Sequence, residues 1–446
     1  MPPSNLSYGD TRALVGYVQD LRGLMTALSA RPFDIDDQPE SFQYRERFFS
    51  QKPESAVRKI LFVCPYVPRL GAHGGATVMY NLIRNLTEKY RVSVLAFAHD
   101  SEEMSAREPL KAFCEKVELV RLRAAPDSIQ AFIACGFSVF RHFFDPNMRG
   151  KLLQMLSEDD YDIIHYEMSQ MGQYIIPSKR SLNLLSVYEL SYLKERECTY
   201  SRGLQKRLRW ISTLDEEMRA ARRADFVITL SDYDRARMAR FLGNRKIATI
   251  GVGCELKVFS DHSNDKDQSS VAFLGSFMHP PNIEAVLFFV NKILPLIREE
   301  APTVKFLVIA SGESSEISRL EGSEISVSYA RGPDKDLLLG RCKVFVAPIL
   351  SGSGVRIKIL EAWALGMPVV ATSLACRGLD AIDGWNILIA DTPKLFADRV
   401  LKLFKEDALC QELGRNGLTT VKEYYAWPQI IQKYSKLYSE LLSRRR

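Results

Sequence analysis

The sequence predicts an α/β protein built from two parallel-sheet domains. Its 446 residues exceed what one ordinary hydrophobic core supports. Short apolar runs alternate with helical periodicity, first at Ile60–Cys64 and Thr77–Leu86, and the same alternation restarts at Val271–Leu274. A polar stretch without apolar periodicity, Ser260–Ser270, separates the two series. We therefore expect two Rossmann-like, doubly wound domains.

The composition excludes several classes of protein. A net charge of +6, with 26% charged and 46% hydrophobic residues, is typical of a globular protein, and no nucleic-acid-binding motif is present, so we expect no nucleic-acid partner. The eight cysteines are scattered without C-x-x-C pairs or His partners at ligand spacing, which indicates a reducing compartment and no metal site. The first residues lack a signal-peptide pattern, and no apolar run approaches the ~20 residues of a membrane-spanning helix. We expect a cytoplasmic protein.

The most informative stretch is Pro348–Thr372, which reads PILSGSGVRIKILEAWALGMPVVAT. It predicts a strand at Val344–Ala347, a glycine loop, a helix from about Val355 to Leu365 and a second strand. The bare backbone of Gly352, Ser353 and Gly354 offers amide N–H groups to a phosphate at a helix N-terminus. Arg356 adds a bidentate cation, and the Glu361 carboxylate can accept two hydrogen bonds from a vicinal diol such as a ribose. Together these features predict a seat for a nucleoside diphosphate.

The ordered set of residues from Gly352 to Ala362 resembles the nucleotide-binding signature of retaining family-4 glycosyltransferases, in the variant GSG-x-R-x-K-x-L-E-A. The resemblance implies the GT-B fold, in which the two domains face each other across a cleft. It also implies a donor site that includes Val355 and Lys358, although Lys358 could also point away from the site. It implies no cofactor and no metal ion, because the loop amides and Arg356 would stabilise the departing diphosphate. Most family members carry a glutamate eight residues before the second one, where this chain has Ser353, so the identity of the donor sugar stays open.

The resemblance also implies the domain boundaries. Residues 1–57 precede it as an N-terminal extension, 58–258 would form the acceptor domain and 271–425 the donor domain, and 426–446 would form a helix that crosses back to the first domain. Within the extension, helical spacing predicts an amphipathic helix at Thr11–Ser29. We expect the extension to pack on the domain behind it rather than to carry a separate activity.

Three further glycines follow predicted strands. Gly74 and Gly75 follow the first predicted strand, where open α/β sheets bind ligands, and the resemblance places them beside the diphosphate and the acceptor. Gly275 makes the turn after Val271–Leu274, and Asn282 is expected to cap the next helix. The family often has a lysine or arginine after this strand. None is evident here, which would shift phosphate binding onto Arg356.

His165 and Glu167 lie at the carboxyl end of a short predicted strand. The family carries a D-x-x-H-x-H pattern here, and this chain has Glu167 in place of the second His. Glu167 could act as a base on the acceptor side or bind a sugar hydroxyl, while a structural His and a helix-capping Glu are the simpler interpretations. Asp160-Tyr161-Asp162 matches the D-x-D metal motif of another glycosyltransferase fold, but it leads directly into a strand, and we interpret it as chance.

Two other stretches leave alternatives open. Residues 127–144 are apolar and aromatic, which indicates either a buried helix, the interpretation we favour, or an exposed apolar lip that touches a membrane or a lipid-linked acceptor. Ser201–Arg223 predicts a basic helix interrupted by acidic residues, and we expect a solvated face rather than a contact with acidic lipids. Ser231 is expected to cap the helix that follows Phe226–Leu230.

The resemblance implies a glycosyltransferase that moves a sugar from a nucleoside-diphosphate sugar to an acceptor hydroxyl with retention. The acceptor would be a saccharide, a lipid-linked molecule or a protein, in surface polysaccharide or glycoconjugate synthesis, with a peripheral contact at the inner membrane face as a further hypothesis. Two alternatives remain: a GT-B epimerase or hydrolase of nucleotide sugars, and a non-catalytic partner subunit that binds them.

Overall fold

The computed structural model describes residues 58–71, 74–122, 139–193, 204–243, 246–256, 267–330 and 332–445. The chain divides at Ala56–Val57 into two units, and all the described residues belong to the second. The predictions for the extension, for the helix Thr11–Ser29 and for most of residues 127–144 lie outside the described residues.

The N-terminal domain is a parallel sheet of seven strands in the order β3-β2-β1-β4-β5-β6-β7. Its strands are β1 (Lys59–Cys64), β2 (Arg91–Ala98), β3 (Lys116–Arg121), β4 (Ile163–Glu167), β5 (Leu182–Val187), β6 (Phe226–Thr229) and β7 (Ile247–Thr249). Its helices are α2 (Gly74–Leu86), α3 (Ser101–Ser105), α4 (Arg107–Lys111), α6 (Pro146–Glu158), α8 (Leu204–Arg223) and α9 (Asp232–Leu242), with 3-10 turns η1 (Val139–Phe143) and η2 (Ser169–Tyr174).

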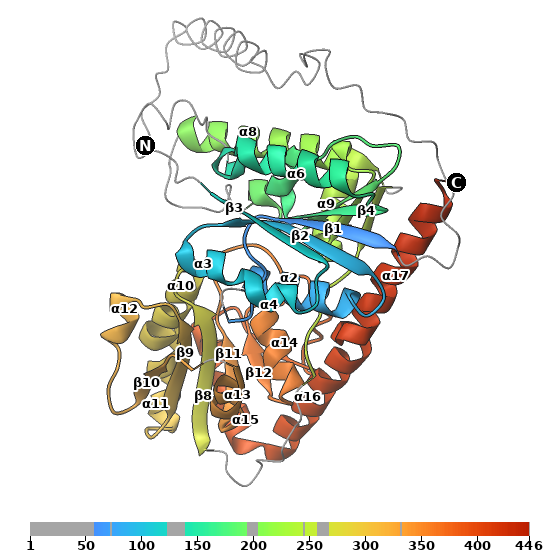
Figure 1. The fold of residues 1–446 in the computed structure, drawn as a ribbon. Helices are drawn as coiled ribbons and strands as arrows, with labels where there is room; N and C mark the ends of the chain where they lie inside the picture. The colour runs from blue at the N-terminus through green and yellow to red at the C-terminus, as the bar shows by residue number, and fades with distance from the viewer. Residues whose placement is uncertain are drawn as a thin grey trace, which may run out of the picture. The chain divides into compact units, whose positions relative to one another are not determined.

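Helices cover both faces of this sheet, α2 on one side and α6 and α8 on the other (Figure 1). The alternation along β1 explains the arrangement. Ile60 and Phe62 are buried with α2, whereas Leu61 and Val63 are buried with residues of α6 and α8. A strand that is buried on both faces reads as a continuous apolar run, which is why the sequence predicts it well.

The C-terminal domain is a second parallel sheet, of six strands in the order β10-β9-β8-β11-β12-β13. Its strands are β8 (Asp267–Ser276), β9 (Lys305–Ser311), β10 (Ile325–Ser328), β11 (Cys342–Ala347), β12 (Val369–Ala371) and β13 (Leu388–Ile389). Its helices are α10 (Pro280–Phe288), α11 (Leu294–Glu300), α12 (Ser315–Ser318), α13 (Gly332–Gly340), α14 (Ile357–Ala364), α15 (Pro393–Lys405) and α16 (Asp407–Thr420), with π-helical turns η4 (Phe289–Ile293) and η5 (Val421–Tyr425). Two Rossmann-like domains confirm the predicted fold class.

The predicted linker is too long at its carboxyl end. Asp267–Ser270 belongs to β8, because Ser270 pairs with Lys305 of β9 and its hydroxyl accepts a hydrogen bond from the amide of Lys343 at 3.2 Å. These residues are polar, so their sequence carries no apolar alternation that would indicate a strand.

Strand order reverses next to β8 and β11, so the loops that leave these neighbouring strands diverge. A parallel sheet binds ligands at such a switch point, at the carboxyl ends of its strands. Gly275 was expected in the turn after the strand, but it is the next-to-last residue of β8 and pairs with Ala310 of β9, and the glycine loop Pro348–Arg356 follows β11. The fold therefore brings two of the predicted donor segments together.

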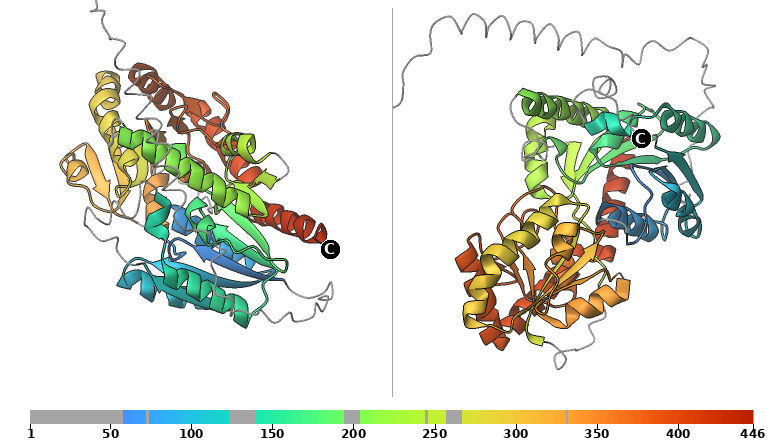
Figure 2. Two further views of the ribbon diagram at one scale, coloured as in Figure 1. Left: turned by 90° about the horizontal axis from the view of Figure 1, so that it is seen from above. Right: turned by 90° about the vertical axis from the view of Figure 1, so that its left-hand side faces the viewer.

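Helix α17 (Trp427–Ser443) connects the two domains. It contacts α2, and Arg445 just beyond its end donates to the Ser178 carbonyl at 2.8 Å and to Asp225 at 3.2 Å. Figure 2 shows α17 leaving the C-terminal sheet and running along the N-terminal one. No helix in the described part of the chain has both the length and the apolar character needed to span a bilayer.

The crossing depends on a bare backbone at Gly253. A Cβ atom at Gly253 would overlap the Trp427 ring at the start of α17. We expect Gly253→Ala to destabilise the protein by about 1–3 kcal/mol, because the ring or the backbone must shift. Thermal unfolding measures the loss. Gly150→Ala in α6 is the control: its Cβ would meet nothing within 4 Å, so the melting temperature should stay level or rise. Equal effects of the two variants would contradict this account.

A candidate nucleotide-sugar site between the two domains

The glycine loop after β11 has a backbone that only glycine adopts easily. Gly352 and Gly354 have φ angles of +94° and +80°, in the left-handed region. Helix α14 begins at Ile357, two residues later than the sequence predicts, because Arg356 is still outside helical geometry with ψ at 84°. The loop is therefore longer than predicted, and Val355 and Arg356 belong to it.

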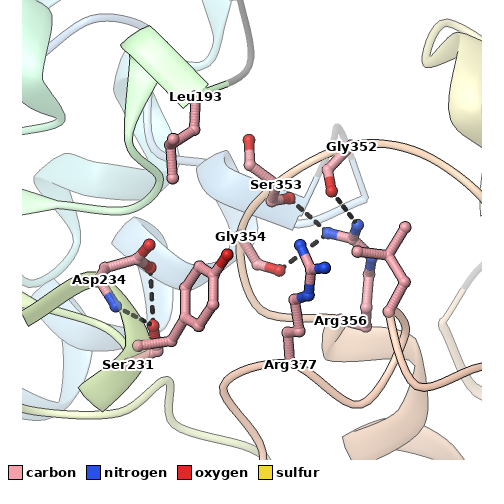
Figure 3. Close-up of a pocket in the computed structure, with 10 residues that line it drawn as sticks. Leu193, Ser231, Asp234, Gly352, Ser353, Gly354, Arg356 and Arg377 are labelled. Carbon is pink, nitrogen blue, oxygen red and sulfur yellow. Dashed lines mark hydrogen bonds between the residues drawn. The ribbon is translucent and has the colours of Figure 1, made fainter. Parts of the chain in front are cut away.

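The Arg356 guanidinium organises this loop (Figure 3). It donates to the carbonyls of Gly352 and Gly354 at 2.7 and 2.8 Å, to that of Ser351 at 3.3 Å, and also to that of Ser353. In a planar trans peptide the N–H points opposite to the C=O. The amides that follow these carbonyls therefore point away from the guanidinium. The expected arrangement, in which Arg356 and the loop amides hold one phosphate together, is not the arrangement in this structure.

Lys358 extends toward β8 and α10. Its Nζ donates to Asn282 Oδ1 at 2.6 Å and lies 4.2 Å from the centroid of the Phe273 ring. Burial lowers the pKa of Lys358 well below its ordinary range, and the charge of Arg356 adds to this effect. A Cβ at Gly275 would lie 2.9 Å from the Asn282 side chain, so glycine is required there.

The prediction that Asn282 caps a helix is wrong. Helix α10 starts at Pro280 with His279 before it, and Asn282 is a buried residue of its first turn. The Asn282 amide donates to the Ser276 carbonyl at 2.7 Å while its oxygen accepts from Lys358. This residue therefore links the turn after β8 to helix α14. Ser231, in contrast, caps α9 as predicted, because its hydroxyl accepts from the Asp234 amide at 3.1 Å.

The Glu361 carboxylate is ion-paired with Lys335 of α13. A ribose at Glu361 would therefore meet this lysine as well. Lys335 was not predicted as a site residue, because it lies 26 positions before its partner and its helix carries no recognisable motif.

The N-terminal domain approaches the loop at three points. Ser353 Oγ donates to Glu189 Oε2 at 2.8 Å. A Cβ at Gly74 would lie 3.3 Å from Ile357 Cδ1, and one at Gly378 would lie 2.8 Å from Ser231 Cβ and 3.1 Å from Val355 Cγ2. Gly74 and Gly75 form the first turn of α2 instead of a loop, so their amides lie at a helix N-terminus.

A pocket opens between the two domains at this place (Figure 3). It is lined by Leu193, Ser231, Tyr233, Asp234, Gly352, Ser353, Gly354, Arg356, Leu374 and Arg377. Arg377 was not predicted as a site residue. Its guanidinium carbon lies 5.3 Å from the centroid of the Tyr233 ring, and it adds a second positive charge to the lining. Nothing in the spacing of the sequence indicates that the loop after β12 reaches this pocket.

His165 and Glu167 do not line this pocket. Both side chains are fully buried in the N-terminal domain, and the His165 nitrogens bond Tyr438 Oη at 3.0 Å and Ser186 Oγ at 2.6 Å. Burial lowers the pKa of His165 to about 3, so the ring is neutral. Burial raises the pKa of Glu167 to about 8, which the neighbouring Tyr188 hydroxyl partly offsets. In this structure the pair forms part of the packing between β4 and α17, and their catalytic role stays a prediction.

Two family models match most of the described chain. The model described as Glycosyltransferase Family 4 matches residues 72–258, and the one described as Glycosyl transferases group 1 matches residues 268–406. The chain is a glycosyltransferase of the GT-B fold. The first match covers most of the N-terminal domain of this glycosyltransferase, and the second covers most of its C-terminal domain.

Relatives of this glycosyltransferase are distant. It is 28% identical over 170 residues to an uncharacterized 44.6 kDa protein in the cps region of Klebsiella pneumoniae, covering 36% of this chain and 44% of that relative. An uncharacterized glycosyltransferase of Methanocaldococcus jannaschii is 24% identical over 50% of this chain and 61% of that relative. The chain therefore spans about half the length of these first two relatives. The phosphatidyl-myo-inositol mannosyltransferase of Mycobacterium tuberculosis is 22% identical over 325 residues, covering 68% and 79%.

Solved structures share its fold. Sucrose-phosphate synthase from Thermosynechococcus elongatus matches with a TM-score of 0.68 at 18% identity, over 87% of this chain and all of that one. Anabaena HepE, solved in complex with UDP, matches with a TM-score of 0.61 at 15% identity, over 86% of this chain and all of that one.

The raised pKa of Glu167 gives a test of its environment. Between pH 4.5 and about 8, Glu167 keeps its proton in the folded protein but has lost it in the unfolded chain. The free energy of unfolding therefore falls as the pH rises through this window. We expect Glu167→Gln to melt several degrees above wild type at pH 9 and close to it at pH 5. Differential scanning calorimetry across this range measures the difference. Glu412→Gln, on the exposed face of α16, should show no such trend, and parallel curves for Glu167→Gln and wild type would refute the assignment.

Proposed function

We propose that the protein transfers a sugar from a nucleoside-diphosphate sugar to an acceptor hydroxyl with retention, without a metal ion. The observation that carries this proposal is the glycine loop at the switch point of the C-terminal sheet, whose amides turn outward because Arg356 holds the carbonyls. Negative charge grows on the leaving diphosphate in the transition state. Fixed N–H dipoles in a partly enclosed site stabilise such charge without reorganisation.

Arg356 then acts mainly as an organiser of the loop. Its charge lies directly behind the amides, so it also adds a favourable field for the diphosphate. Lys358 is held against Asn282, which places a further hydrogen-bond donor beside the turn after β8. Glu361 would bind the ribose, sharing its carboxylate with Lys335.

The comparisons suggest the class of donor and acceptor. HepE has been solved with UDP and with UDP-glucose, and several relatives are named for mannosyl transfer to phosphatidyl-myo-inositol. The Klebsiella relative is encoded in a cps region. We infer a UDP- or GDP-linked hexose as the donor and a lipid-linked or saccharide acceptor, in surface polysaccharide or glycoconjugate synthesis at the inner membrane face.

The burial of His165 and Glu167 favours one rival, a subunit that binds nucleotide sugars without catalysis. Such a subunit would bind the donor and leave it intact in the presence of every acceptor. Release of nucleoside diphosphate from a bound sugar nucleotide, measured with and without acceptor lipids, separates the two functions.

The donor site is tested by thermal shift with UDP-, GDP-, ADP- and dTDP-sugars in EDTA. We expect one nucleotide to stabilise wild type, by about 2.7 kcal/mol at one hundred times its dissociation constant. Arg356→Ala and Glu361→Gln should each weaken binding roughly 10- to 100-fold, because each removes charged hydrogen bonds. Arg341→Ala is the matched control. This exposed arginine directly precedes β11, at the end of the strand opposite to the glycine loop. No stabilisation by any nucleotide would refute the proposed function, and a shift that requires Mg²⁺ would refute its metal independence.

A further inference from the structure

A carboxylate of the N-terminal domain, Glu189, stands at the tip of the glycine loop. Glu189 follows β5 at the carboxyl edge of its sheet, and its Oε2 accepts a hydrogen bond of 2.8 Å from Ser353 Oγ. A Cβ at Gly354 would lie only 3.5 Å from Glu189 Cβ. The carboxylate is therefore next to the loop backbone whose amides form the proposed diphosphate seat.

The segment that carries Glu189 is fixed in place. Its neighbours Tyr188 and Leu190 are buried. The amides of the next two residues, Ser191 and Tyr192, donate to the carboxylate of Glu217 at 3.1 and 3.2 Å. Glu189 is thus held at its position by the core of its own domain, and Ser353 fixes its carboxylate from the other domain.

The groups around Glu189 are polar and come from several strand ends. Tyr66, after β1, has its pKa raised first by burial and then by the charge of Glu189. Asp234, at the start of α9, lies close enough for Glu189 to contribute to the rise in its pKa, after burial. A hydroxyl-bearing ligand in this space would meet acceptors from two elements, while the loop presents N–H donors from the other domain.

The chemistry of this place differs from that of the diphosphate seat. A sugar on the β-phosphate of a bound nucleotide is joined to the phosphorus through one bridging oxygen, so it must lie next to the loop amides that hold this phosphate. A carboxylate has about four acceptor positions, so the bond from Ser353 is compatible with further bonds from neighbouring hydroxyls of a hexose. The Ser353 hydroxyl holds this carboxylate beside the loop.

We propose that Glu189 is a specificity-determining residue that accepts hydrogen bonds from hydroxyls of the donor's sugar. This rests on the proposed function, since it assumes that the diphosphate binds at the loop. The N-terminal domain then selects the sugar, while the C-terminal domain holds the nucleotide. Ser353 is a positioning residue that acts through Glu189.

The test separates the sugar from the nucleotide. Isothermal titration measures the affinities for UDP, UDP-glucose, GDP and GDP-mannose in wild type, Glu189→Gln and Ser353→Ala. Glutamine can still accept the bond from Ser353, so the loop contact survives while the charge is lost. We expect Glu189→Gln to weaken binding of the sugar nucleotide roughly 10- to 100-fold. Binding of the bare diphosphate should be unchanged or slightly tighter, because a negative charge beside it has been removed.

Glu284→Gln is the matched control. Glu284 is an exposed carboxylate of α10, in the C-terminal domain, that accepts a hydrogen bond from Ser351 of the same loop. We expect it to change neither affinity. The double variant Glu189→Gln with Ser353→Glu moves the carboxylate from one side of the contact to the other, and it should recover part of the preference for the sugar nucleotide.

The outcomes are distinct. If Glu189→Gln and Ser353→Ala weaken the diphosphate and the sugar nucleotide equally, the contact only joins the domains and the inference is wrong. If Glu189→Gln binds the sugar nucleotide as wild type does, the inference is also wrong while the proposed function stands. If wild type binds none of the four compounds, or if a different nucleotide alone stabilises it, the choice of donor fails and the inference fails with it.

Discussion

The bonds from the Arg356 guanidinium to the carbonyls of the glycine loop are the interaction on which the candidate site depends. They hold a stretch with two left-handed glycines in a single conformation and leave the peptide N–H groups on its outer side. The loop carries both kinds of contact in the candidate site, outward amides for an anion and the Ser353 hydroxyl for Glu189. The Arg356 cation binds the carbonyls on one side of the loop. The N–H groups on the other side, together with this positive charge, favour the binding of a diphosphate there.

The second constraint is the connection between the domains. Trp427, at the start of α17, packs against the bare backbone of Gly253. The helix ends against the N-terminal sheet, where Tyr438 bonds His165. Burial keeps His165 uncharged and raises the pKa of Glu167 to about 8. His165 and Glu167 belong to β4, and His165 bonds Ser186 of β5, so the same packing supports the strand that Glu189 follows.

Two side chains have partners in this structure that the sequence did not predict. Asn282 was expected to cap a helix and instead joins the turn after β8 to Lys358, because its helix begins two residues earlier at Pro280. Arg356 was expected to point at a phosphate and instead lies inside the loop. In both cases the residue type and its segment were right, while the partner was wrong, since a side chain bonds whatever the fold brings within reach.

By itself the sequence determined the class of fold, the glycine loop after β11 and the segment that forms the candidate donor site, because apolar periodicity, glycine and motif spacing are local properties of the chain. Only the tertiary structure decided that Lys335 pairs with Glu361, that Arg377 reaches the pocket, and that Glu189 meets Ser353 across the two domains. The last two residues lie 164 positions apart. Contacts of this kind arise from the packing of one sheet against another, and no local pattern records them.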